Sequence, residues 1–268
     1  MIRVAGELMG TPLRALRRST AWWAVALGVI VLVTVAFWPA FRGASGISEA
    51  IEQMPAGVVQ AFGLEDFGTP AGFLRGNLYE LLVPLLLIGA GVAFVNSQTA
   101  SDETAGRLEL VLAQPVSHRA VYLGRAAAAL IGLTILVVVI VAVQFAADAV
   151  FDLAIDGSRL AATIALCGLL AALHAAAGYS IAGARARPAL VLGIGIGGAI
   201  AGYVVAALFP LSDALEPWSH LSPWDWAFGH NPLAHTTDAW RYVVLAAPAA
   251  ALIGLGTWLV GRRDVSAA

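Results

Sequence analysis

The chain of 268 residues contains no lysine, so that all 15 of its basic residues are arginine. This absence excludes a phosphate-binding loop of the Walker A type, which needs the lysine of G-x-x-x-x-G-K-[ST]. It also excludes an enzyme that forms a Schiff base through a lysine amine. The absence of lysine does not exclude the use of ATP that is bound by a partner.

Cysteine and charge are also scarce. The one cysteine, Cys167, excludes a disulfide within the chain and a metal cluster with several cysteine ligands. Charged residues make up 12% of the chain, about half of their share in a soluble domain, and the mean hydropathy is +0.83. The net charge of −2 gives no sign of nucleic-acid binding. This composition predicts an integral membrane protein.

The sequence contains many long apolar runs. A helix that spans a membrane needs roughly 20 predominantly apolar residues. The runs predict an all-α membrane protein with a single domain, residues 1–268. Its six spans are expected at 21–37, 78–97, 122–147, 159–183, 188–209 and 241–260. Pro84 and Pro248 lie inside the second and sixth spans and predict kinks there.

The distribution of arginine predicts the orientation. With the N-terminus inside, eleven arginines lie in inner segments and four in outer ones, whereas twelve of the 17 acidic residues lie outside or at the outer rim. Cytoplasmic loops of membrane proteins carry the excess of arginine. Both termini and the loop 101–119 are therefore expected in the cytoplasm, and 38–76 and 210–240 are the long outer loops.

Residues 1–20 predict an amphipathic helix on the inner membrane surface, because apolar side chains recur there at helical spacing and arginines occupy other positions. A cleaved signal peptide is not favoured, since no small-x-small cleavage site follows the first apolar run. In the first outer loop, SGISEAIEQM and PAGVVQAF predict two short amphipathic helices separated at Pro55.

One dense charged segment, SDETAGRLELVLAQPVSHR, interrupts the apolar runs at residues 101–119. Leu108, Val111 and Leu112 fall on one face of a helix. Pro115 would end this helix, and Ser117 can cap the next one. The residues alone leave two interpretations open: a solvated turn with an interfacial helix, or a docking element for a soluble partner.

The longer stretch ETAGRLELVLAQPVSHRAVYLGR, residues 103–125, resembles the cytoplasmic loop of type-2 ABC transporter permeases. The family pattern runs approximately E-x-x-x-G-T-L-E-L-L-L-A-Q-P-V-S-R and continues to a Leu-Gly-Lys. Here Arg107 replaces the usual threonine and Arg125 the usual lysine. LSPWDWAFGHNPL (221–233) is similar to the last outer loop of the family, and GRRDV (261–265) to its C-terminal end. The resemblance thus covers nearly the whole chain.

This resemblance implies that loop 101–119 is a coupling helix in a groove of a separate ATP-binding-cassette ATPase. It further implies a second permease chain, the same or paralogous, and a multi-pass position in a prokaryotic cytoplasmic membrane. ATP and Mg²⁺ would be bound by the ATPase, with no cofactor on this chain. The residues expected to transmit force are Glu103, Gly106, Arg107, Leu108, Glu109, Leu112, Pro115 and Arg119.

The function that follows from the resemblance is export of a hydrophobic or amphipathic small molecule, such as a drug, antibiotic or lipid-like compound. The alternative is a mechanotransmitting subunit of the same fold, which would drive an extracytoplasmic partner instead of moving cargo. A membrane enzyme is not favoured. GASG (43–46) resembles the nucleophile motif of rhomboid proteases, with His174 as a conceivable base, but no spanning helix follows Ser45 directly.

Candidates for the transport path are Tyr79, Glu80, Gln144, His174, Gly195 and Gly198. Gln144 either faces a polar cavity or marks the membrane edge. His174 is either a functional group within the membrane or a neutral histidine bonded to a neighbouring helix. GIGIGG (193–198) matches a dinucleotide fingerprint, but inside an apolar span its G-x-x-x-G pairs favour close helix packing, at a dimer seam or along the path.

The last outer loop holds the side chains that a metal would need. They are His220, Asp225, His230 and His235. No closely spaced pair such as H-x-x-x-H occurs among them. The loop also carries Trp218, Trp224, Trp226 and Trp240, which favour anchoring at the membrane interface. We therefore predict no metal site.

Overall fold

The computed structural model describes residues 2–42, 53–61, 68–112 and 115–263, and over these ranges it contains helices but no β-strand. Six helical runs are long and apolar enough to cross a membrane. They are Gly10–Phe41, Pro70–Thr104, His118–Phe151, Gly157–Ala184, Pro188–Leu211 and Ala239–Val260. The predicted all-α fold with six spans is confirmed.

The first element, α1, is one continuous helix from Ile2 to Ala36. The sequence suggested a surface helix over 1–20 followed by a separate span, but the structure has no break between the two. The reason is local: the one proline of this stretch, Pro12, lies near the start, and no further proline follows before the helix ends. A short helix, α2 (Trp38–Phe41), continues the run.

The second span is built from several pieces. α5 (Pro70–Leu74) leads into a π-helical turn, η1 (Arg75–Tyr79), and α6 (Leu82–Gln98) follows after a break at Glu80 and Leu81. The break lies where Pro84 predicts a kink. A proline ring clashes with the carbonyl four residues earlier, and here that carbonyl belongs to Glu80. α14 (Ala239–Val260) instead carries Pro248 in its interior.

The remaining spans begin and end within a few residues of the predicted bounds. They are α9 (His118–Phe151), α10 (Gly157–Ala184), α11 (Pro188–Leu208) and α14. The predicted cap of α9 is confirmed, since the Ser117 hydroxyl accepts a hydrogen bond from the Ala120 amide at 3.2 Å. At the start of α10 the Asp156 carboxylate accepts bonds from the Ser158 hydroxyl and from the amides of Ser158 and Arg159, which lower the pKa of Asp156.

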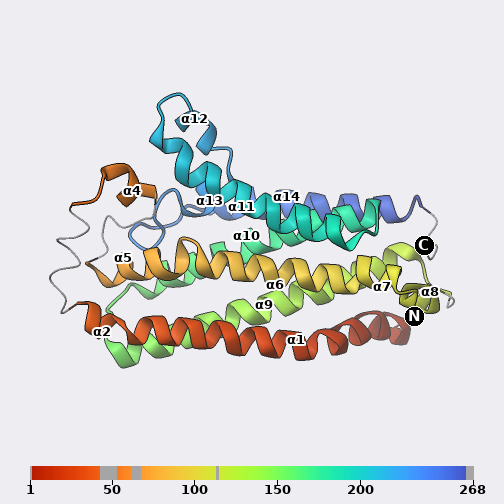
Figure 1. Ribbon diagram of the computed structural model, residues 1–268. Coiled ribbons are helices and arrows are strands. Elements are labelled where there is room, and N and C mark those ends of the chain that lie inside the picture. The colour runs from red at the N-terminus through yellow and green to blue at the C-terminus, as the bar shows by residue number, and fades with distance from the viewer. Residues whose placement is uncertain (1, 43–52, 62–67, 113–114, 264–268) are drawn as a thin grey trace.

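α10 is the central helix of the bundle and packs against α6, α9, α11 and α14, whereas α1 packs mainly along α9 at the edge (Figure 1). The crossing of α10 and α14 is very close: a β-carbon at Gly183 would collide with the backbone of Gly256. α11 has the smallest buried share of the six spans. Its buried residues are Val191, Gly195 and Ala199, which share one face.

Both ends of the described chain lie at one end of the bundle, together with α7 (Ala100–Thr104) and α8 (Arg107–Leu112) (Figure 1). We call this the inner end, after the arginine distribution. The opposite, outer end carries α4 (Ala56–Ala61), η2 (Phe209–Leu211), α12 (Glu216–Ser219) and α13 (Pro223–Phe228). α4 falls within the predicted PAGVVQAF helix. Most of SGISEAIEQM, and Ser45 of GASG, lie outside the described residues.

Candidate functional site: a charged inner end and an outer pocket

The charged loop folds as two short helices, α7 and α8, and not as one. Gly106 joins them with a φ of +71°, in the left-handed region that glycine adopts without steric cost. The single helix expected here is therefore divided at Gly106. α7 continues the second span almost directly, so that only α8 projects as a separate unit.

Glu103 of α7 is buried and fully occupied by partners from this chain. Its carboxylate receives two hydrogen bonds from the Arg263 guanidinium, at 2.6 and 2.8 Å, and one from the Tyr122 hydroxyl at 2.8 Å. Glu103 is one of the residues expected to couple the chain to an ATPase. The structure places its carboxylate inside this chain, with the charged and hydrogen-bonded partners that a buried carboxylate needs.

Arg263 links this carboxylate to the end of α10. It donates to the backbone carbonyls of Ala182 and Gly183 at 3.0 and 2.9 Å, which are among the last carbonyls of that helix. Burial disfavours the charged form of Arg263, but the hydrogen bonds with Glu103 and Tyr122 outweigh this effect and raise its pKa. A cation at a helix C-terminus is also favoured by the helix dipole. Arg263 thus connects α7, α9, α10 and the segment after α14.

A second ionic group lies beside the first. Asp102 pairs with Arg107 at 2.7 Å and with the buried Arg125 at 3.1 Å. Arg125 also donates to the backbone carbonyl of Gln98 at the end of α6. An arginine can make both contacts at once, because its guanidinium presents several donors in one rigid plane. The replacement of the usual lysine by Arg125 therefore adds a connection between the loop and the second span.

α8 exposes its charged side chains Arg107 and Glu109 and buries Leu108. Leu108 is only 1% exposed and belongs to the core of this chain, so it is not available to a partner groove in the way the sequence suggested. Arg107, Glu109, Pro115 and Arg119 are exposed. Arg119 lies against Gly261, where any β-carbon would collide with its guanidinium. The surroundings of the Leu112 side chain lie outside the described part of the structure.

Two candidates for the transport path are bonded to each other. The Tyr79 hydroxyl donates to the Gln144 side-chain oxygen at 2.9 Å, and both residues are fully buried. Both side chains are therefore enclosed by the bundle. Within the described part of the chain, its amide nitrogen has no hydrogen-bond partner.

The other intramembrane candidates occupy packing positions or open faces. The His174 ring lies 2.9 Å from the carbonyl of Leu170 in its own helix, and not against a neighbouring helix. A β-carbon at Gly195 would collide with Val92, so this glycine allows α11 to approach α6 closely. Gly198 has nothing within 4 Å of the position of a β-carbon. These residues do not form one continuous site.

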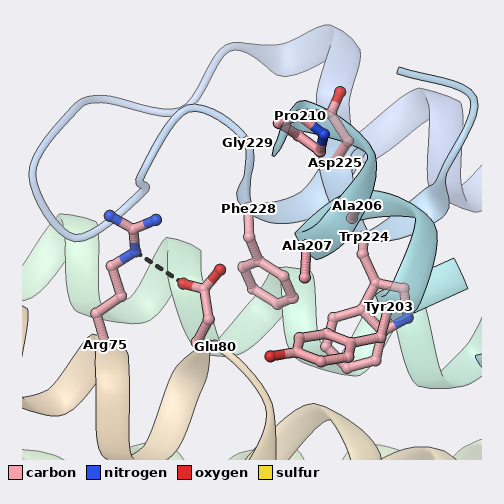
Figure 2. A pocket seen from close by; sticks show the side chains of 10 residues that line it. All are labelled: Arg75, Glu80, Tyr203, Ala206, Ala207, Pro210, Trp224, Asp225, Phe228 and Gly229. Carbon is pink, nitrogen blue, oxygen red and sulfur yellow. Dashed lines mark hydrogen bonds and ion pairs between the residues drawn. The ribbon is translucent and has the colours of Figure 1, made fainter. Parts of the chain in front are cut away.

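Glu80 lines a cavity of about 150 Å³ at the outer end (Figure 2). It forms an ion pair with Arg75 at 2.7 Å. The two residues are five apart, and the amide of Glu80 bonds to the carbonyl of Arg75 in the π-helical pattern, which brings their side chains onto one face. The cavity is lined by Arg75, Glu80, Tyr203, Ala206, Ala207, Pro210, Trp224, Asp225, Phe228 and Gly229.

Two histidines of the last outer loop contact other side chains of that loop. His220 contacts Asp225 at 3.2 Å and His230 contacts Thr237 at 3.0 Å. No group of three metal-binding side chains occurs among the residues that the structure describes. Trp224 is buried, and its indole donates to the carbonyl of Ala199 in α11 at 2.9 Å. It is a structural anchor of the loop and does not lie at the surface as the interface prediction required.

Sequence reasoning missed the partners that complete both sites. Arg263 was noted only as part of a family-like ending, and neither Tyr122 nor Tyr203 was singled out. Arg263 lies 160 residues from Glu103, so no local spacing could have joined them. For Tyr203, its position four residues after Ala199 on the inward face of α11 was the available signal.

A six-helix bundle with a charged inner-end loop defines this chain as a multi-pass membrane protein. Residues 7–260 match the family model described as the C-terminal domain of the multidrug efflux system permease Rv1217c. Because this match covers almost the entire sequence, the chain belongs to that family. No curated protein matches the chain significantly.

Proposed function

We propose that this chain is the membrane-spanning permease of a type-2 ATP-binding-cassette exporter, and that a separate ATPase drives it through α8. The observation that carries the proposal is the construction of the inner end. α8 presents Arg107 and Glu109 outward, while Glu103 in the preceding helix α7 is bonded to Tyr122 of α9 and to Arg263 after α14. Membership of an efflux-permease family supports export as the direction.

A force on α8 would reach most of the bundle. α7 is bonded to α9 through Tyr122, and to the end of α10 and the segment after α14 through Arg263. Arg125 adds a contact from α9 to the end of α6. Buried, charge-assisted hydrogen bonds of this kind resist separation. We therefore expect α8 and the inner ends of four helices to move as one body when the ATPase subunits close.

A second permease chain, the same or paralogous, would complete the transporter along α11. This helix turns Gly193, Gly197 and Gly198 outward, with nothing within 4 Å of their β-carbon positions. Small residues let helices approach closely in a membrane, where packing drives association. The cargo would be a hydrophobic or amphipathic small molecule, in keeping with the family name, and the setting a prokaryotic cytoplasmic membrane.

The proposal is tested by reversing the exposed charge on α8. In inside-out vesicles that contain the chain and its ATPase, Glu109→Arg should leave ATP hydrolysis in place but reduce ATP-driven uptake of a fluorescent amphipathic dye at least about tenfold, which is a coupling change of about 1.4 kcal/mol. Leu112→Asp should have the same effect. Asp213→Arg, a charge reversal at the outer end, is the control and should transport normally. Normal uptake by both α8 variants would refute the coupling role.

A further inference from the structure

We propose that the outer cavity binds an organic cation, with its positive group among the rings of Tyr203, Trp224 and Phe228 and between the carboxylates of Glu80 and Asp225. This inference rests on the proposed export function and names the chemical class of cargo that would pass this point.

The aromatic wall of the cavity is held in place by its own contacts. Trp224 meets Tyr203 edge-on with ring centroids 5.2 Å apart, and Phe228 at 6.0 Å. The indole hydrogen bond to Ala199 fixes Trp224 against α11. Figure 2 shows these rings on the side of Glu80 that faces away from Arg75. The faces of aromatic rings attract cations, most strongly where water is excluded.

The charges on the cavity wall favour a cation over an anion. Arg75 is paired with Glu80 at 2.7 Å, so the two cancel each other. Asp225 is the further carboxylate, and its partner in the structure is His220 at 3.2 Å. The nearby Arg241 donates to the backbone carbonyls of Asp225 and Trp226 and does not form part of the wall. The charged residues of the wall itself, Arg75, Glu80 and Asp225, carry one net negative charge, and Arg241 behind the wall also interacts electrostatically with Asp225.

The size limits what can enter. A cavity of about 150 Å³ in another protein holds one benzene molecule. The outer cavity has the same volume and so has room for one ring or one trimethylammonium group. A larger amphipath would place only its cationic head there. Quaternary ammonium groups suit such a site, because they cannot form strong hydrogen bonds and rely on rings and carboxylates for recognition.

The Arg75–Glu80 pair also separates two spaces. A second, much smaller cavity shares Arg75, Glu80 and Phe228 with the first and reaches Tyr79. Tyr79 is the residue bonded to Gln144 in the interior. A cation that competes with Arg75 for Glu80 would weaken the wall between these spaces. The ion pair is thus both a binding element and a barrier between the interior and the outer cavity.

The experiment measures binding directly, without the ATPase. The purified full chain in maltoside micelles, which contain no quaternary ammonium, is titrated with benzyltrimethylammonium. The neutral isostere 2,2-dimethylpropylbenzene is titrated in parallel. Asp225→Asn and Glu80→Gln should each weaken binding of the cation by about tenfold, as expected for the loss of one partly desolvated charge contact. Arg75→Gln should instead strengthen binding, because it frees Glu80.

Matched controls keep the test decisive. Asp213→Asn removes an exposed outer-end carboxylate outside the cavity and should bind like wild type. Tyr203→Leu keeps an apolar side chain but removes a ring and should weaken only the cation. Unfolding temperatures identify any variant that is misfolded. The inference is wrong if wild type does not bind the cation, if it binds the neutral isostere equally well, or if Asp225→Asn and Glu80→Gln behave like Asp213→Asn.

Binding and transport can fail separately. If the predicted binding pattern holds but ATP drives no flux in vesicles, the cation site stands and the exporter function is wrong. If ATP-driven flux is normal but the variants bind the cation as wild type does, only the cation site is wrong.

Discussion

Arg263 holds both carboxylate oxygens of Glu103, at 2.6 and 2.8 Å, although 160 residues separate the two in the sequence. The pair joins the last described residue of the chain to α7, at the start of the charged loop. The geometry uses the two-pronged form of the guanidinium, which a lysine ammonium cannot reproduce. The segment after the sixth span therefore holds the loop between the second and third spans in place.

The first prediction concerns the strength of this pair. Arg263→Lys and Glu103→Gln should each lower the free energy of unfolding by about 1–3 kcal/mol, because each leaves a buried polar group with an incomplete partner. In a double-mutant cycle the pair should show a coupling of about 1–2 kcal/mol. Denaturant titration in detergent measures both quantities.

The neighbouring Arg262 provides the control for that cycle. Its guanidinium stacks on the Trp258 ring at 3.9 Å, and Arg262→Lys keeps a cation there. Its cost should stay below about 1 kcal/mol. Equal losses of unfolding free energy in the two arginine variants would show that the bidentate contact of Arg263 stabilises the protein no more than the stacked Arg262 does.

The second prediction separates two glycines that both lie in apolar helices. Gly183→Ala should destabilise the protein by at least about 2 kcal/mol, because the new methyl group has to displace the backbone at Gly256 in a tightly packed crossing. Gly254→Ala in α14 should be neutral or stabilising by up to about 1 kcal/mol, since it meets no atom within 4 Å and alanine favours a helix more than glycine does. Thermal unfolding of the two variants provides the comparison, and equal costs would contradict the close crossing.

The third prediction is a pH dependence at the outer end. Burial, aided by the nearby Arg241, lowers the pKa of His230 to about 4. The pKa of histidine in an unfolded chain is about 6.5. Between these values the unfolded state binds the extra proton, so His230 makes stability fall as the pH drops from about 6.5 towards 4.

Replacement of His230 tests this dependence. His230→Gln keeps a nitrogen donor for Thr237, which lies 3.0 Å from the ring, but removes the titrating group. Unfolding temperatures between pH 7.5 and 4.5 should therefore fall less steeply in this variant than in wild type. Parallel curves for the two proteins would disprove the assignment of the effect to His230.

The spans were the most predictable part of the fold, and α11 shows why. It covers Pro188–Leu208, against an expected 188–209, because lipid forces every backbone polar group of an apolar run into the hydrogen bonds of one helix. Bounds set by polar or broken segments were less accurate. α1 continues through residue 20, and the second span contains a π-helical turn that apolar content does not encode.

The candidate sites were predictable only in their local parts. The cap at Ser117 depends on neighbouring residues and follows from residue type, whereas the division of the charged loop at Gly106 was not predicted. The inward turn of Leu108 and the burial of Trp224 depend on which helices pack beside them. A leucine in an amphipathic loop helix can pack inside its own chain or against a partner protein. A tryptophan in an outer loop can pack inside the protein or lie at the membrane interface, and the sequence alone does not distinguish these alternatives.

By itself the sequence predicted that the chain forms six membrane-spanning helices, which loops share an end of the bundle, and where the one charged loop lies. These features follow from local composition, because the cost of placing charge or unpaired backbone in lipid applies to each segment separately. Only the tertiary structure decided that Glu103 meets Arg263, that Tyr79 meets Gln144, and that Glu80 faces a ring-lined cavity. Such contacts depend on how helices far apart in the sequence pack against each other, and the sequence of a single helix does not encode that arrangement.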